Sequence, residues 1–485
     1  MAYNFVRCDR DQAFLLPPSL SDWLPKDHLA RFVVSAVSVL NLKDFNKHRR
    51  LDGWGRAAYD PAMMIALLIY SYATGIRSSR QIERRCADDL AFRYITANEI
   101  PDHSTLARFV ADHEAAIGGL FAQVLRLAVE LGMVRVGLVA LDSTRVKANA
   151  SPGANRTKEW IDREVSKIVA EARGNDDQDA QHPEPSAEAI PKELVDDNER
   201  LARLRAAKSR LEADETRRQQ AYEAKLAKRT QHKEETGKEL PGRKPKPPAE
   251  RKRDAERSKK ANITDPDSRT MSTANSGYQQ GFNAQTVVTE DQLTVAVSVT
   301  NEATDFAQVG PMARQSITNL REAGVKASLG VLVADCGYLS DDNLKLEDEL
   351  GVELLISTRE RTAPPRGRTP AGLSRTQLMT RKLSTKRGRA LYAKRGGAIE
   401  ATFGQLRQRG MGRFRRRGLA ACESEWRFEH AVHNLLKIRA SGKGLPAGSP
   451  APNAAETTAT RRQRRLPRPQ ITLSWLCQRH IERRP

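Results

Sequence analysis

The spacing of apolar residues divides the chain into a helical first part and a later part rich in short strands. Over the first 125 or so residues, capping residues predict three helix starts, at Asp60, at Ser78 and at Asp102 or Ser104. The run Met63–Tyr72 provides the apolar face of the first of these helices. Two or three short helices with a basic side resemble a helix-turn-helix unit, and a plain helical bundle is the alternative.

Three short apolar runs predict buried strands, namely Val136–Leu141, Gly330–Ala334 and Val352–Ile356. The first two runs are each followed directly by an aspartate, Asp142 and Asp335. We therefore expect two strands of one sheet to end in an acidic residue.

Further elements are expected around the second of these strands. The β-rich runs Phe282–Thr289 and Leu293–Thr300 predict a hairpin. Asp305 is expected to cap a helix, and Ser340–Glu349 to form another. The basic, proline-containing segment Arg359–Arg389 is expected to be an extended loop.

A charged stretch of about 100 residues separates the first predicted strand from the hairpin. Helical spacing is kept by two sets of apolar residues: Ile161, Val165 and Ile168, and then Leu194, Leu201, Leu204 and Leu211. The pattern fades after Leu211, and Pro241–Pro248 is a basic, proline-rich break. We expect an inserted helical hairpin or short coiled coil, acting either as a solvated spacer or as a DNA-binding arm.

Without this insertion, the elements follow the order of the ribonuclease-H-like fold. A strand with Asp142, two strands, a helix, a strand with Asp335, a helix and a strand lead to a helix Ala398–Arg407 that carries Glu400. We expect an α/β core with a mixed five-stranded sheet. The expected regions are an all-α N-terminal domain (1–130), the α/β core (134–155 and 261–440), a helical insertion after the first strand (156–260) and a disordered basic tail (441–485).

The charge of the chain favours a polyanionic partner. Lysine and arginine number 81 against 60 aspartates and glutamates, a formal net charge of +21, so we expect DNA or RNA ahead of a membrane. The five cysteines are scattered and form no CxxC pair, which favours a reducing cytoplasm. The start of the chain has no apolar signal region, and the longest apolar run, Met63–Tyr70, is too short to span a bilayer.

The acidic residues are candidates for a metal-dependent active site. At the carboxyl ends of neighbouring strands, Asp142 and Asp335 would converge, and Glu400 would close over the same edge. Three convergent carboxylates need a cation, and their hard oxygens suit Mg²⁺ or Mn²⁺. Two such ions about 4 Å apart support in-line phosphoryl transfer. A single aspartate after a strand is more often a turn or cap, so the combination carries the prediction.

The motifs around these acids resemble bacterial insertion-sequence transposases of the DDE type. Asp335-Cys-Gly-Tyr338 is similar to the segment around their second aspartate, and Asp142-Ser-Thr-Arg-Val-Lys-Ala-Asn149 to that around the first. Their Tyr-Arg-Glu-Lys signature is matched by Tyr392, Arg395, Glu400 and Arg407. The step from Arg395 to Glu400 is one residue longer than in that family, and arginine replaces the final lysine.

The resemblance implies metal ligation by the three acids, phosphate binding by Tyr392 and Arg395, and a DNA-backbone contact from Arg407. Independently of it, two groups of basic residues are DNA-binding candidates, and a solvated basic surface is the alternative for each. They are Arg413, Arg415 and Arg416, and, on the second predicted helix, Arg80, Arg84 and Arg85.

The function implied is DNA transposition, with two Mg²⁺ or Mn²⁺ ions as cofactors. The partners would be double-stranded DNA, both the inverted-repeat ends of an element and its target, bound by a homodimer. Two alternatives stay open, a nuclease or resolvase of the same fold that joins no strands, and a non-catalytic DNA-binding protein derived from a transposase.

Overall fold

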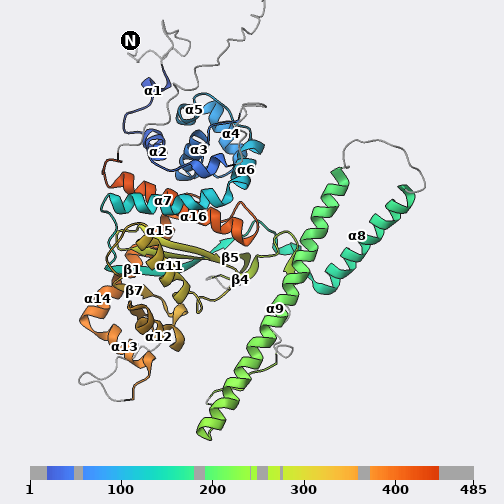
Figure 1. Cartoon of the computed structure of the whole chain (residues 1–485), viewed down its shortest axis with the longest axis vertical. Coiled ribbons are helices and arrows are strands. Elements are labelled where there is room, and N and C mark those ends of the chain that lie inside the picture. The colour runs from blue at the N-terminus through green and yellow to red at the C-terminus, as the bar shows by residue number, and fades with distance from the viewer. Residues whose placement is uncertain are drawn as a thin grey trace, which may run out of the picture.

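The structure is a computed structural model that describes residues 19–47, 58–179, 192–240, 242–247, 260–273, 277–358 and 372–446 (Figure 1). The expected disordered tail, beyond residue 446, lies outside the described residues, as does most of the proline-containing part of the expected basic loop. Among the described residues, no helix combines the length and the apolar character needed to cross a membrane.

A mixed sheet of six strands forms the centre of the molecule. Its strands are β1 (Leu138–Lys147), β4 (Arg269–Ser272), β5 (Tyr278–Thr289), β6 (Thr294–Thr300), β7 (Val331–Ala334) and β8 (Glu353–Ile356). The order is β4-β5-β1-β7-β8, with β6 also paired to β5. β5 runs antiparallel to β1, β4 and β6, whereas β7 is parallel to β1 and β8 is parallel to β7. The predicted mixed sheet is confirmed, but it has a sixth strand, β4. This strand was not predicted because its short sequence, Arg-Thr-Met-Ser, shows no strand pattern.

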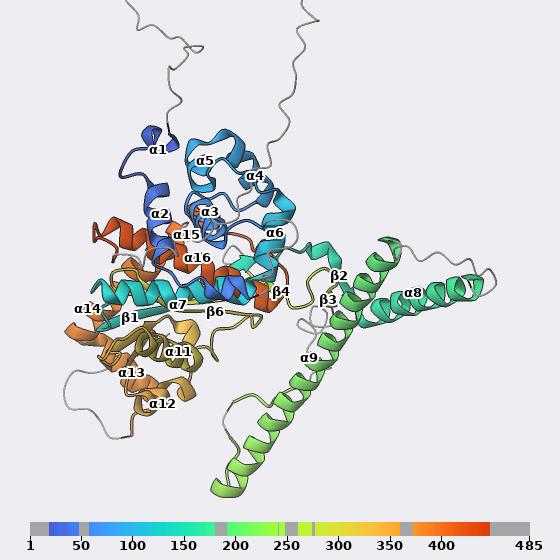
Figure 2. The ribbon, with the colours of Figure 1, turned by 45° about the horizontal axis from the view of Figure 1, so that its top comes forward.

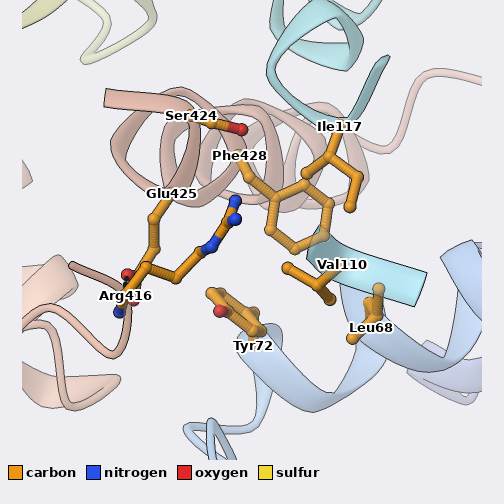
Figure 3. A pocket seen from close by; sticks show the side chains of 8 residues that line it. All are labelled: Leu68, Tyr72, Val110, Ile117, Arg416, Ser424, Glu425 and Phe428. Carbon is orange, nitrogen blue, oxygen red and sulfur yellow. Dashed lines mark hydrogen bonds between the residues drawn. The ribbon is translucent and has the colours of Figure 1, made fainter. Parts of the chain in front are cut away.

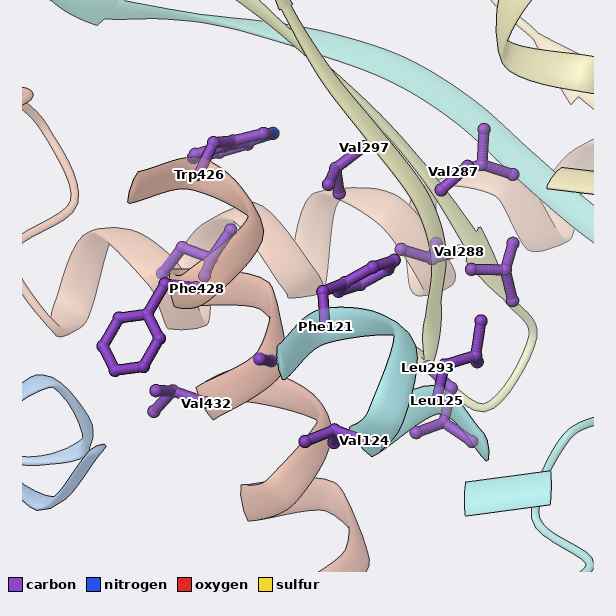
Figure 4. Close-up of a cluster of buried hydrophobic side chains, with 14 of the residues drawn as sticks. Phe121, Val124, Leu125, Val287, Val288, Leu293, Val297, Trp426, Phe428 and Val432 are labelled. Carbon is purple, nitrogen blue, oxygen red and sulfur yellow. The ribbon is translucent and has the colours of Figure 1, made fainter. Parts of the chain in front are cut away.

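Helices cover both faces of the sheet (Figures 1 and 2). α7 (Glu114–Glu130) and α16 (Leu419–Ala440) lie together on one face, and α11 (Val309–Glu322) and α12 (Asp341–Leu350) lie on the other. Figure 4 shows the core between α7, α16 and the β5–β6 hairpin. Its labelled side chains are Phe121, Val124, Leu125, Val287, Val288, Leu293, Val297, Trp426, Phe428 and Val432.

The N-terminal helices agree with the predicted starts. They are α1 (Leu20–Trp23), α2 (Leu29–Ser38), a 3-10 turn (Lys43–Asn46), α3 (Pro61–Ala73), α4 (Ser79–Asp88), α5 (Leu90–Thr96) and α6 (His103–Asp112). Asp60 and Asp102 cap α3 and α6 through their carboxylates. Ser78 occupies the N-cap position of α4, but its side chain makes no capping hydrogen bond, so the predicted capping box is wrong.

A buried ionic network joins these helices to α16. Arg77, between α3 and α4, places its guanidinium 2.8 Å from Glu425 Oε1 and 3.7 Å from Glu429 Oε2. Arg409 Nε lies 3.4 Å from Glu429 Oε1. Beside this network is a small cavity, lined by Glu425 together with Phe428 of α16 and apolar side chains of α3, α6 and α7 (Figure 3). The N-terminal helices and the sheet therefore share one continuous core.

The insertion forms a helical hairpin that projects from the sheet (Figures 1 and 2). α8 (Lys158–Asp179) packs on α9 (Lys192–Thr236), and the short strands β2 (Asn155–Thr157) and β3 (Lys260–Asn262) form its base. The two helices share a separate apolar core that includes Ile161, Ile168, Leu204 and Leu211, as the spacing predicted. α9 continues well beyond Leu211, to Thr236. Its later residues are rich in alanine, glutamate, lysine, arginine and glutamine, which have high intrinsic helix propensity.

The prediction of an extended loop over Arg359–Arg389 is wrong for the described residues, 372–389. Residues 375–384 form α13 (Arg375–Ser384), and α14 (Lys386–Arg395) follows directly. Ser374 and Gln377 form a capping box at the start of α13. The high content of basic residues concealed these local helix signals.

Candidate active site

Asp142 and Asp335 each directly follow the last paired residue of two neighbouring parallel strand segments. In the β1–β7 pair, Leu141 is in register with Ala334, and each aspartate is the next residue. Asp142 does not end its strand as expected, because β5 pairs with β1 as far as Lys147. β7 stops at Ala334. Asp142 therefore lies where the pairing with β7 ends, five residues before the bridge between Lys147 and Arg413.

The two carboxylates have different environments. Burial raises the pKa of Asp142, the N–H of Ser143 and the guanidinium of Arg395 lower it, and the charge of Asp335 raises it. Asp335 Oδ1 accepts a hydrogen bond of 2.8 Å from the backbone N–H of Gly337 and so caps the 3-10 turn Cys336–Tyr338. The side chain of Asp335 is thus held by the backbone of Gly337, two residues later.

Glu400 lies on a π turn that absorbs the extra residue of the signature. The turn Gly396–Glu400 connects α14 to α15 (Ala401–Gln408) within one continuous helical path. A π turn contains one residue more than an α turn, so residues five apart share a face. Arg395 Nη2 accordingly lies 3.6 Å from Glu400 Oε1. The Glu400 side chain is 67% exposed, on the outer side of Arg395.

Arg395 connects two of the three predicted acids. Its Nη1 donates a hydrogen bond of 2.7 Å to Asp142 Oδ2, and its side chain is only 17% exposed. The ring of Tyr392 lies 6.0 Å from the guanidinium carbon. The structure therefore places the predicted phosphate-binding arginine against a carboxylate, where it supplies the positive charge that Asp142 needs.

The donor atoms of the site suit a hard divalent cation. Asp142 and Asp335 offer adjacent carboxylates, whose repulsion a cation would relieve. Within the described ranges, however, no three carboxylate, imidazole or thiol side chains are grouped closely enough to hold a metal ion. The residues that fit a divalent cation here are therefore the two aspartates, whereas the side chain of Glu400 is largely exposed on its helix.

Basic side chains follow β1 away from this acidic pair. Arg407 is exposed, and its Nη2 lies 3.3 Å from the hydroxyl of Thr144, two residues beyond Asp142. Arg413 and Arg415 are also exposed, and Arg413 Nε donates to the carbonyl of Ala148 at 3.1 Å. Arg407 and Arg413 therefore contact the segment that follows Asp142, and Arg415 comes two residues after Arg413.

Arg416 and the basic residues of α4 are placed differently. Arg416 forms an ion pair of 2.6 Å with Glu114 of α7, so its guanidinium is engaged within the fold. Arg80, Arg84 and Arg85 are exposed on α4, on the far side of α7 and α16 from the sheet (Figures 1 and 2). The structure does not bring these four arginines to the acidic pair.

The sequence analysis missed an acidic side chain beside the site. Asp305, expected to cap a helix, instead accepts hydrogen bonds from Asn283 and Gln285 of β5. The N-cap position of α11 is Gln308. The amide residues Asn283 and Gln285 within the predicted strand were the available signal, since buried amides need partners.

Comparison with protein families gave two matches. Residues 18–112 match the family described as Transposase domain (DUF772), and residues 368–439 match the family described as Transposase DDE domain. The second match includes Tyr392, Arg395, Glu400 and Arg407. The searches of curated proteins and of solved structures gave no match. The two matches together support an insertion-sequence transposase of the DDE type.

Proposed function

We propose that the protein cuts DNA at the ends of an insertion sequence and joins those ends to target DNA. The observation that carries the proposal is that Asp142 and Asp335 directly follow the last paired residues of two parallel strands, Leu141 and Ala334. Arg395 and Glu400 lie on the adjoining helical segment, within the matched DDE domain. The order β6-β5-β1-β7-β8 supports a ribonuclease-H-like core for this chemistry.

In this proposal Asp142 and Asp335 hold Mg²⁺ or Mn²⁺, and Glu400 completes the site when its side chain turns inward. The bound ions would activate the attacking oxygen and stabilise the leaving oxygen of a phosphodiester. Arg395 has two competing roles, since Oδ2 of Asp142 and a DNA phosphate are alternative partners for its guanidinium. We expect Arg395 to release Asp142 and bind the phosphate next to the cut.

The proposed DNA path runs along β1 from Asp142 towards the bridge between Lys147 and Arg413. Arg407, Arg413 and Arg415 would contact successive phosphates there. Arg80, Arg84 and Arg85 on α4 would contact a separate stretch of DNA, as a recognition helix does. Joining two ends requires two such paths, and we therefore expect a homodimer in the DNA complex.

The experiment uses the full chain, duplexes carrying the sequences that flank its coding region, a supercoiled target and Mg²⁺. We expect 3′-end cleavage followed by a joined product. Asp142→Asn is expected to lower both by about 10³-fold or more while DNA binding is retained. Asp291→Asn, at the β5–β6 turn, is the charge-matched control and should behave as the wild type.

The alternatives give different results in the same assay. Cleavage without any joined product would favour a nuclease or resolvase. Binding without cleavage in either Mg²⁺ or Mn²⁺ would favour a non-catalytic DNA-binding protein and overturn the proposal.

A further inference from the structure

The distal part of α9 extends beyond the apolar core that the hairpin shares. Leu211 is the last residue of α9 in that core, but the helix continues to Thr236. At about 1.5 Å per residue, roughly 37 Å of single helix remains. The a/d-like spacing of leucines stops at Leu211, and Leu226 is 39% exposed. This part of α9 therefore offers no apolar seam to a second helix.

An ion pair fixes α9 to the catalytic core where this distal part begins. Nη1 of Arg217 lies 3.3 Å from Oε1 of Glu302, in the loop between β6 and α11. The same loop is bonded to β1, because Nη2 of Arg145 donates to the carbonyl of Ala303 at 2.7 Å. Arg145 comes three residues after Asp142. The distal part of α9 thus starts near the acidic pair and projects on the side of the sheet that α11 and α12 cover (Figures 1 and 2).

Opposite charges lie on different sides of this distal helix. Residues 11 apart are separated by about three turns and so share a side. Glu223 and Glu234 form one such pair, and Arg218 and Arg229 form another. Lys225 lies on the side of the arginines, four residues before Arg229. At about 100° per residue, the two glutamates are at least about 120° round the helix from these basic residues.

The chain that follows α9 adds positive charge to the basic side. Nη2 of Arg229 donates hydrogen bonds to the carbonyl of Leu240, at 2.6 Å, and to that of Gly242, at 3.2 Å. The next residues bring Arg243 and Lys246, which are both exposed. The hydrogen bonds of Arg229 therefore hold two basic stretches together, although their charges repel one another.

We call Glu212–Thr236, with residues 237–240 and 242–247, the basic arm. Near the base of the hairpin, cations pair across the two helices, as Lys208 does with Asp162 at 2.7 Å. In the arm, Lys244 pairs with Glu239 at 3.5 Å. Several other cations of the arm form no ion pair with any residue that the structure describes, namely Lys225, Lys228, Lys233, Lys238, Arg243 and Lys246. The charge of the base is thus neutralised within the fold, whereas that of the arm is not.

The surface of the arm suits the phosphate backbone of a nucleic acid better than a second protein chain. Exposed cations without partners attract phosphates, and the release of counterions from DNA adds to the binding free energy. Lysine binds phosphate as a point charge and carries no information about the base sequence. Such a surface binds duplexes of any sequence.

We propose that the basic arm binds the phosphate backbone of target DNA, whatever its sequence, beside the acidic pair. The inference rests on the proposed function and deepens it, since element ends must be recognised by their sequence and target DNA need not be. The Arg217–Glu302 ion pair fixes where the arm leaves the core. The helix then carries its basic side along the target duplex, while the arginines beside β1 bind the element end.

The test compares two triple variants of the full chain. In one, Lys225, Lys228 and Lys233 are all replaced by glutamine, and in the matched control all three are replaced by arginine. Glutamine and arginine have helix propensities close to that of lysine, so both variants keep the helix. Binding to a duplex of unrelated sequence is measured from about 50 to 200 mM salt. The slope of log affinity against log salt concentration should fall by up to about 2.7 in the glutamine variant, and stay unchanged in the arginine variant.

Cleavage and joining assays then identify the DNA that the arm holds. In the glutamine variant, joining to the supercoiled target at about 200 mM salt should fall about tenfold or more, while 3′-end cleavage stays within about threefold of the wild type. Equal loss of cleavage and joining would assign the arm to the element end and overturn the target assignment. An unchanged salt slope would overturn DNA binding by the arm. A reduced slope, in a protein whose wild type neither cuts nor joins, would support DNA binding by the arm and overturn the proposed function instead.

Discussion

At the scale of single residues, the proposed function makes Arg395 and a divalent cation competitors for the carboxylate of Asp142. Its hydrogen bond of 2.7 Å to Asp142 Oδ2 uses an oxygen that a metal ion would need. We predict that Arg395→Gln binds Mn²⁺ at least as tightly as the wild type, since a competing cation is removed. DNA cleavage by the same variant should fall by about 10²-fold or more, because a charged donor to the phosphate is lost.

The measurements for Arg395 are Mn²⁺ titration and single-turnover cleavage. Arg387→Gln is the control. Arg387 lies on the same helix, α14, eight residues before Arg395, and pairs with Glu353 of β8 at 2.6 Å. If Mn²⁺ binding falls together with cleavage, Arg395 supports the shape of the site and does not exchange partners.

Single residues also mark the limit of prediction from sequence. That Asp142 and Asp335 follow neighbouring strand segments was predictable, because each comes directly after an apolar run. The continuation of β1 past Asp142 to Lys147 was not predictable, because it depends on pairing with β5. The positions of Asp305 and Arg416 were not predictable either, because their partners, Asn283 and Glu114, are distant in sequence. A polar side chain alone does not indicate whether it meets solvent, DNA or another part of the fold.

At the scale of elements, the π turn Gly396–Glu400 keeps the two halves of a helix in phase despite one added residue. We predict that deleting Gly397 converts the turn to α-helix and leaves Arg395 and Glu400 on one face. Cleavage should stay within about threefold of the wild type, and thermal stability should rise, since a helical glycine is removed. Gln292 donates to the carbonyl of Gly397 at 3.0 Å, and loss of this bond limits the gain.

Insertion of one alanine after Gly397 is the matched control for this deletion. It adds a second residue that the turn does not absorb, and so rotates Glu400 by about 100° relative to α14. Its cleavage activity should fall to background. Equal loss in the deletion and the insertion would contradict the idea that the π turn only absorbs the extra residue.

α16 gives the fold a defined dependence on pH. Burial lowers the pKa of His433 to about 3, from an ordinary value of 6.5, with the hydrogen bond to Gln292 raising it and the charges of Arg409 and Lys437 lowering it. The unfolded state therefore binds a proton that the folded state does not. The stability contributed by neutral His433 is complete above pH 6.5 and is lost as the pH falls towards 3.

We predict a smaller loss of stability on acidification for His433→Gln. Below pH 6.5, the slope of unfolding free energy against pH should decrease by up to about 1.4 kcal/mol per pH unit. Urea unfolding of the full chain at several pH values measures the slope. His232→Gln, on the projecting part of α9, is the control. The same slope in wild type and His433→Gln would show that His433 does not remain neutral in the fold.

The same helix shows why some elements escaped prediction. α3 and α6 were predictable because aspartate caps precede apolar runs. The buried side of α16 instead contains Glu425, Glu429, His430 and His433 among its apolar residues. Such a helix has no apolar stripe to recognise, because its polar groups find partners only in the folded molecule.

At the scale of the whole molecule, the arginines behind the net charge of +21 fall into two classes, those paired with glutamates inside the fold and those exposed to solvent. Some arginines, such as Arg77 and Arg416, neutralise glutamates between the N-terminal helices and α16. Others, such as Arg413 and Arg415, face solvent beside the acidic pair. A count of charged residues in the sequence does not distinguish these two classes. Only the second class has solvent-exposed guanidinium groups that could contact the phosphates of DNA.

Salt dependence of DNA binding distinguishes the two classes of arginine. Each phosphate contact adds about 0.9 to the slope of log affinity against log salt concentration for duplex DNA. Arg413→Ala and Arg415→Ala should therefore each reduce the slope by about 0.9 with the fold intact. Arg416→Ala should keep the wild-type slope but lower the free energy of unfolding, because Glu114 and the wall of the cavity in Figure 3 lose their partner. Binding isotherms from about 50 to 200 mM salt, with urea unfolding of each variant, measure both quantities. A reduced slope in Arg416→Ala with unchanged stability would indicate that Arg416 contacts DNA and that its ion pair with Glu114 does not stabilise the fold.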